Sequence, residues 1–163
     1  MAGVKVRARN NSIKTPNPAL AAGLAFAGLV TASISMGLIW SSLASTDSPS
    51  FQRMWPIPGL YLGEAVVLPA LVLWAVLVAD YRAAWLAIGA LATLALLGAM
   101  SIGLLVALPL IFLVPACVLG DDGRSPASQK VAAFLLGSLF QGGVMFGFIQ
   151  YFLRRPMSSP DGG

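Results

Sequence analysis

Long apolar runs separated by short polar segments form the main pattern of this 163-residue chain. Residues 1–18 are polar and basic, and the apolar run 19–43 follows them directly. A helix over that run would extend about 37 Å, enough to cross a hydrocarbon core of about 30 Å with some tilt. The pattern predicts a first transmembrane helix anchored by a basic cytoplasmic segment, with cleavage at the small-x-small site 42–44 as the alternative.

Two further spans are marked by the polar segments around them. Proline and small polar residues predict loops at 44–58 and 120–130. The run 59–79 follows the first loop, and the run 131–153 follows the second. Each is long enough to cross a bilayer as a helix, and a flexible polar tail, 154–163, comes after the last one.

The stretch 83–119 contains no charged residue, and as one helix it would extend about 55 Å, nearly twice the hydrocarbon thickness. We expect it to divide near residues 98–103, where glycine and serine favour a tight reversal. The halves 83–98 and 102–119 then each supply one crossing. Ser101 would be the N-cap of the second half.

The alternative for this stretch is one long helix that bends around Pro109 and Pro115, which leaves four spans. With the N-terminus in the cytoplasm, both arrangements place seven Lys and Arg residues inside and three outside, so the positive-inside rule orients the N-terminus and leaves the C-terminus open. Span length decides between them. The sequence therefore predicts an all-α, polytopic integral membrane helix bundle with five transmembrane helices.

Composition agrees with lipid as the solvent of this chain. Apolar residues make up 58% of it and charged residues 10%, against about 45–50% and 25% in soluble domains. The net charge of +4 arises from Lys and Arg scattered between apolar runs, so it predicts membrane topology and no nucleic-acid partner. We expect a plasma, or cytoplasmic-type, membrane protein.

Candidate chemistry is sparse. The chain has one cysteine, Cys117, and no histidine, which removes the commonest zinc ligand and the commonest general base. It shows no nucleotide loop, metal motif or activated nucleophile. We therefore expect no enzymatic activity, no cofactor and no metal.

Glu64 is an acidic residue inside an apolar span, where a charged side chain is not expected. It lies five residues, about 7–8 Å, inside the predicted outer end of its span at Gly59. An acid at membrane depth is a functional hypothesis by default. Glu64 could have a structural role, either capping the helix that begins at Ser101, since helix N-termini attract acceptors, or hydrogen-bonding to Ser35 or Ser138. The alternatives are that it binds a proton or cation, or that it contacts a lipid headgroup or a partner.

Small residues at four-residue spacing mark possible helix contacts. Gly59 with Gly63, and Gly143 with Gly147, form GxxxG patterns that allow close backbone approach in lipid. They could hold the chain's own bundle together. The alternative is a seam between copies, with Gln141 hydrogen-bonding across it.

These features predict a non-enzymatic accessory or structural membrane component, whose partners are the lipid bilayer and either further copies or another membrane protein. The alternative is a small homo-oligomeric transporter or channel in which Glu64 is the proton or cation site.

Overall fold

The computed structural model describes residues 17–44, 56–99, 103–121, 123 and 125–154. About nine tenths of this part is helical and none of it is strand. The helices are α1 (Pro18–Ala44), α3 (Pro56–Leu77), α4 (Tyr81–Leu97), α5 (Gly103–Ala107), α6 (Leu110–Gly120) and α7 (Ala127–Arg154). The predicted all-α bundle is confirmed.

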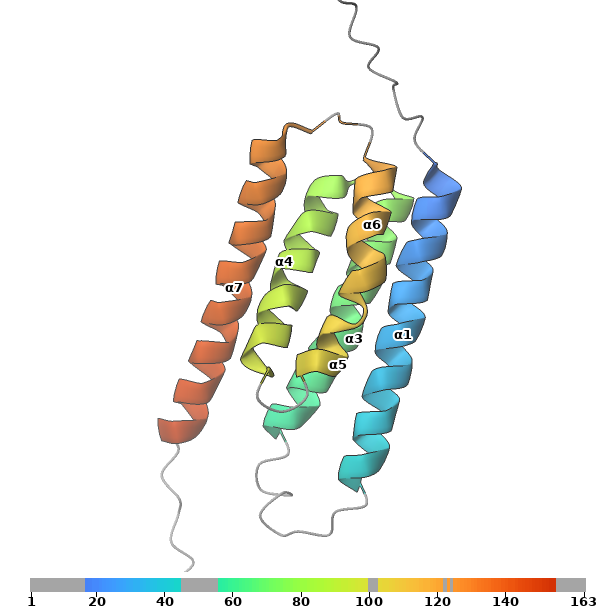
Figure 1. Ribbon diagram of the computed structural model, residues 1–163. Helices are drawn as coiled ribbons and strands as arrows, with labels where there is room; N and C mark the ends of the chain where they lie inside the picture. Colours follow the sequence, from blue (N-terminus) through green and yellow to red (C-terminus); the bar gives the residue numbers. More distant parts are fainter. Residues whose placement is uncertain (1–16, 45–55, 100–102, 122, 124, 155–163) are drawn as a thin grey trace, which may run out of the picture.

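The chain runs up and down the bundle, as Figure 1 shows. α1 and α3 are antiparallel, α4 reverses again, α5 and α6 together return, and α7 runs beside α4 in the same direction. The start of α1 and the end of α7 therefore lie at opposite ends of the molecule. This is the path that five crossings require.

Four helical segments are long and apolar enough to cross a membrane: Pro18–Leu43, Gly59–Leu77, Gly103–Gly120 and Ala127–Tyr151. The fifth helix, α4, is apolar overall and 17 residues long, which is the lower limit for a span.

The single bent helix over 83–119 is excluded. α4 ends at Leu97, and the chain turns back so that α5 and α6 pack alongside it. The turn is tight: the Gly103 N–H donates to the Gly98 carbonyl at 2.6 Å, and a side chain on Gly103 would collide with the backbone of Ala95 and Gly98. The proposed cap, Ser101, lies outside the described residues.

The connection between α3 and α4 is shorter still, at three residues, 78–80. Ala79 has a left-handed backbone, with φ of 58°. Around it the Ala79 N–H donates to the Val76 carbonyl at 3.2 Å and the Asp80 N–H to the Ala75 carbonyl at 2.8 Å, the hydrogen-bond pattern of a Schellman motif. The Asp80 side chain then accepts from the Ala83 N–H at 3.2 Å and caps α4.

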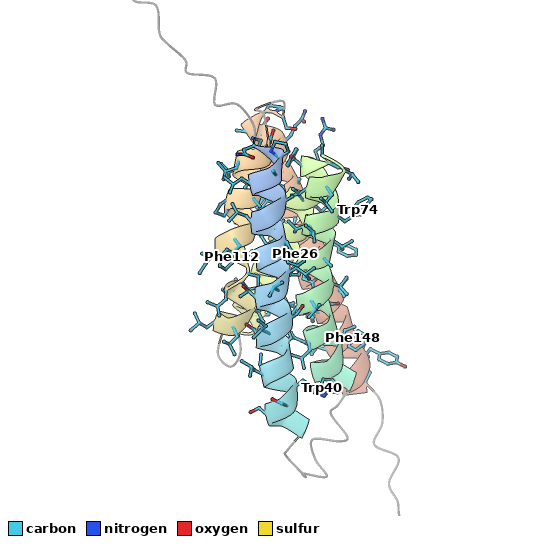
Figure 2. The ribbon with its side chains drawn as sticks, turned by 90° about the vertical axis from the view of Figure 1, so that its right-hand side faces the viewer. Phe26, Trp40, Trp74, Phe112 and Phe148 are labelled. Atoms are coloured by element: carbon cyan, nitrogen blue, oxygen red, sulfur yellow. The ribbon has the colours of Figure 1, made fainter. Side chains whose placement is uncertain are left out.

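α4 is the central helix of the bundle. It packs against α3, α7, α5 and α6, whereas α1 packs against α3 and α6, and α7 packs chiefly against α4. Large apolar side chains cover the outside of the bundle as well as its core. Among the exposed ones are Phe26, Trp40 and Trp74 (Figure 2). Such a surface suits lipid, which solvates apolar side chains. The largest fully buried apolar side chains of the core include Val72, Ile88, Leu91, Leu94, Val106 and Leu113.

Candidate intramembrane polar site

Glu64 lies inside the spanning part of α3, which runs from Gly59 to Leu77. It is five residues from the Gly59 end and four residues, about 6 Å, from the midpoint of this segment. Because the cost of a charged side chain in a membrane helix is highest at the centre, about 2.5–3.5 kcal/mol for an aspartate, the position demands a partner.

That partner is Gln141, at the middle of α7. Its Nε2 donates to Glu64 Oε2 at 2.5 Å, across 77 residues of sequence. Gln141 is buried, with 4% of its surface exposed, while Glu64 is partly exposed. The bond joins α3 to α7, which otherwise rests on α4. Glu64 is thus the acceptor of an interhelical hydrogen bond.

Two more hydrogen bonds surround this pair. Ser138, one turn before Gln141, donates its hydroxyl to the Gly89 carbonyl at 3.0 Å. Tyr61, one turn before Glu64, donates to the Leu94 carbonyl at 2.8 Å. We call Tyr61, Glu64, Ser138 and Gln141 the polar cluster. The sequence placed Glu64 and Gln141 among its candidate polar residues and offered Ser138 as a partner of Glu64, but Tyr61 was not singled out. Tyr61 with Glu64, and Ser138 with Gln141, each show the i, i+3 spacing that places two side chains on one helix face.

Glycines bring α7 close enough for these bonds. Gly89 is the middle residue of α4, and a side chain there would overlap the Phe134 carbonyl of α7. Gly137 is its counterpart on α7, where a side chain would overlap the Leu86 carbonyl. The two backbones touch at these positions, as small residues allow in membranes. Neither glycine stood out in the sequence because neither belongs to a GxxxG pattern.

The glycines that were singled out lie elsewhere. Gly63, Gly143 and Gly147 are exposed, and a side chain on any of them would meet nothing within 4 Å; Gly59 is partly exposed. Gln141 and Gly143 are two residues apart, which separates them by about 200° around the helix. Gln141 therefore faces the bundle and Gly143 faces away. These three glycines do not hold the bundle together, and a seam with another chain stays a prediction.

A second charged group lies at the end of the bundle where α1 begins. The Lys130 ammonium is 2.7 Å from Asp121 Oδ2, which links the end of α6 to the start of α7. Beside it, a cavity of about 140 Å³ is lined by residues that include Asp80, Arg82 and Ser125. This ion pair fastens a loop at the membrane boundary.

The chemistry available in the described part of the chain is limited. It holds no group of three His, Cys, Asp or Glu side chains that would suit a metal ion. Cys117 is fully buried in the apolar core, the setting of an inert thiol. At the level of the polar cluster, one carboxyl group, one amide and two hydroxyls are arranged to join helices.

Comparison with protein-family models, with curated proteins and with solved structures finds no match to this chain. The class of protein therefore follows from its own fold and composition: it is a membrane protein built as a bundle of apolar helices.

Proposed function

We propose that this protein is a non-enzymatic accessory or structural component of a plasma, or cytoplasmic-type, membrane. The observation that carries the proposal is the hydrogen bond between Gln141 and Glu64. It uses the one acid that lies within a spanning segment of the described residues to tie two helices together. An enzyme of this class would need further acids, bases or a nucleophile beside that group.

The remaining polar side chains of the cluster support the same role. Tyr61 and Ser138 donate to backbone carbonyls of α4, so their hydroxyls also fasten α3 and α7 to the central helix. Such bonds are worth about 0.6–2 kcal/mol each in membranes. The polar groups stabilise the bundle, and the outer surface is left for association with other membrane helices.

The native mass of the protein in lipid nanodiscs, with every co-purifying chain identified, tests this proposal. A defined assembly with other membrane proteins, or with further copies, is the expected result. A strictly monomeric protein that catalyses flux would contradict it.

One structural feature favours the alternative function, a small transporter or channel. Polar side chains from two helices, α3 and α7, lie at successive depths: Tyr61, then Glu64 with Gln141, then Ser138. Proton pathways use such series. Proton or cation flux into liposomes that is lost in Glu64→Gln would establish this function. Flux that is unchanged in that variant would contradict a transporter or channel function that uses Glu64.

A further inference from the structure

The hydrogen bond between Glu64 and Gln141 leaves half of the Glu64 carboxyl group without a partner. Gln141 donates to Oε2, and Oε1 accepts no hydrogen bond from any described residue. A carboxyl group offers about four acceptor positions on its two oxygens. Glu64 is partly exposed, and Oε1 is not among the fully buried side-chain atoms that lack a partner, so part of the surface of this oxygen is accessible.

That surface lies at the depth of the hydrocarbon core. Glu64 is five residues inside the spanning segment Gly59–Leu77, about 6 Å from its midpoint, and Gln141 is two residues from the midpoint of the spanning segment Ala127–Tyr151. Lipid tails cannot donate a hydrogen bond to an exposed oxygen. An ionisable side chain in a membrane span therefore pairs with another polar group or faces water.

No cation of the described chain can supply that partner. The spanning segments contain Lys or Arg only in the first turns of α4 and α7, at Arg82 and Lys130, and in the last turn of α7. Arg82 is about 10 Å along the helix axis from Gly89, and Lys130 is about 16 Å from Gln141. Lys130 is also already paired with Asp121. A second copy of this chain would bring no cation to this depth either.

The backbone beside Glu64 is open. Gly63 is exposed, and a side chain there would meet nothing within 4 Å. An approaching helix can therefore come close to the α3 backbone next to the carboxyl group, as small residues permit in membranes.

We propose that Glu64 is the contact site for a partner transmembrane helix that carries a Lys or Arg near its middle. The cation would donate to Oε1 while Gln141 keeps Oε2, so the carboxyl group would be satisfied on both oxygens by charge-assisted and neutral bonds. This inference rests on the proposed accessory function and names the chemistry of its partner.

A designed peptide serves as the probe. An alanine- and leucine-rich transmembrane peptide with one central Lys is compared with the same peptide carrying Leu at that position, by energy transfer to the full-length protein labelled after Gly163 in lipid vesicles. The Lys peptide should bind roughly three- to thirtyfold more tightly than the Leu peptide, the range that interhelical polar contacts provide. A third peptide, with Lys one turn from its end, should bind no better than the Leu peptide.

Glu64→Gln should abolish the preference for the central Lys, because an amide replaces the carboxyl group while it can still bond to Gln141. Thr31→Val is the matched control, since the Thr31 hydroxyl donates to Ala27 of its own helix, and it should leave the preference unchanged. Equal binding of the Lys and Leu peptides, or a preference that survives Glu64→Gln, would overturn the inference. If the protein forms assemblies in nanodiscs but shows no preference for the Lys peptide, the inference about the partner is wrong while the proposed accessory function still stands.

Discussion

At the scale of single residues, the structure depends on polar groups that must be paired because lipid cannot pair them. Glu64 and Gln141 are far apart in sequence and meet where α3 and α7 approach each other, with Gln141 buried and Glu64 partly exposed. Removing one partner leaves the other unsatisfied in a medium of low dielectric, which costs more than the bond itself contributes.

Gln141→Leu should therefore destabilise the protein by about 1–3 kcal/mol, because Glu64 loses its donor. Glu64→Gln should cost less, since two amides can still form the bond. Reversible unfolding in mixed detergent micelles measures both. Gln150→Leu, the same change nine residues further along α7 at a partly exposed position, should stay within about 0.5 kcal/mol of the parent. Equal effects at positions 141 and 150 would show that the pair does not stabilise the bundle.

Ala79 carries a local strain, because its left-handed backbone costs an alanine roughly 1–2 kcal/mol. Ala79→Gly should stabilise the protein by about 0.5–1 kcal/mol, since glycine adopts this conformation freely but loses more entropy on folding. Ala92→Gly, inside α4, should instead destabilise it by about 1 kcal/mol. Thermal unfolding in detergent compares the two; a loss of stability in Ala79→Gly would contradict this account of the turn.

At the scale of helices, α7 is held by its contact with α4. The contact depends on backbone approach at Gly89 and Gly137, where the two helices touch. The outward face of α7 is exposed, with Gly143 and Gly147 open to the surroundings. On α7, glycine is therefore required for packing on the face toward α4 and is not required for packing on the outward face.

Gly137→Val should separate α7 from α4 and reduce stability by about 2–4 kcal/mol, because its side chain would collide with backbone atoms that cannot move aside. Gly143→Val is the matched control and should change the stability of the isolated chain by less than about 1 kcal/mol. Protease resistance of the α6–α7 loop and unfolding in detergent report on both variants. Comparable losses in the two would mean that α7 does not pack as described.

For self-association we expect the outward-facing glycines, Gly143 and Gly147, to matter. Gly143→Leu with Gly147→Leu should lower the homo-oligomeric fraction of the protein in nanodiscs while leaving the monomer folded, because their added side chains point away from the bundle. The measurement is the native mass at fixed protein-to-lipid ratio. An unchanged oligomeric fraction would eliminate this face of α7 as a seam.

At the scale of the whole molecule, the path of the chain places Arg82 and Lys130 at the end where α1 begins, and Arg154 at the other end. The basic segment 1–18 adds four cations next to α1. From the positive-inside rule we propose that the N-terminus faces the cytoplasm and the C-terminus faces the opposite side.

A reporter fused after Gly163 should accordingly be active only on the extracytoplasmic side, and the same reporter fused within the 120–130 loop should read cytoplasmic. A cytoplasmic signal from the C-terminal fusion would contradict the orientation proposed from these charges.

The sequence by itself determined that the chain lies in lipid, that its fold is all-α, and where the chain reverses direction. Lengths of apolar runs set the number of crossings because each must match the thickness of the hydrocarbon core. The glycines at 98 and 103 located the reversal that separates five helices from four, because only small residues fit where the turn brings backbones together. These signals are local, so they can be read along the chain.

Only the tertiary structure decided which polar and small residues meet. The sequence offered the helix start at Ser101 as a partner for Glu64, yet its bond is to Gln141, 77 residues later in the chain. Gly63, Gly143 and Gly147 of the GxxxG patterns face outward, whereas Gly89 and Gly137 make the close contact. Every apolar face is compatible with lipid, so hydrophobicity does not select which face of a helix turns inward. That selection comes from the fit between backbones and from the pairing of a few hydrogen-bonding groups, which exists only once the helices are side by side.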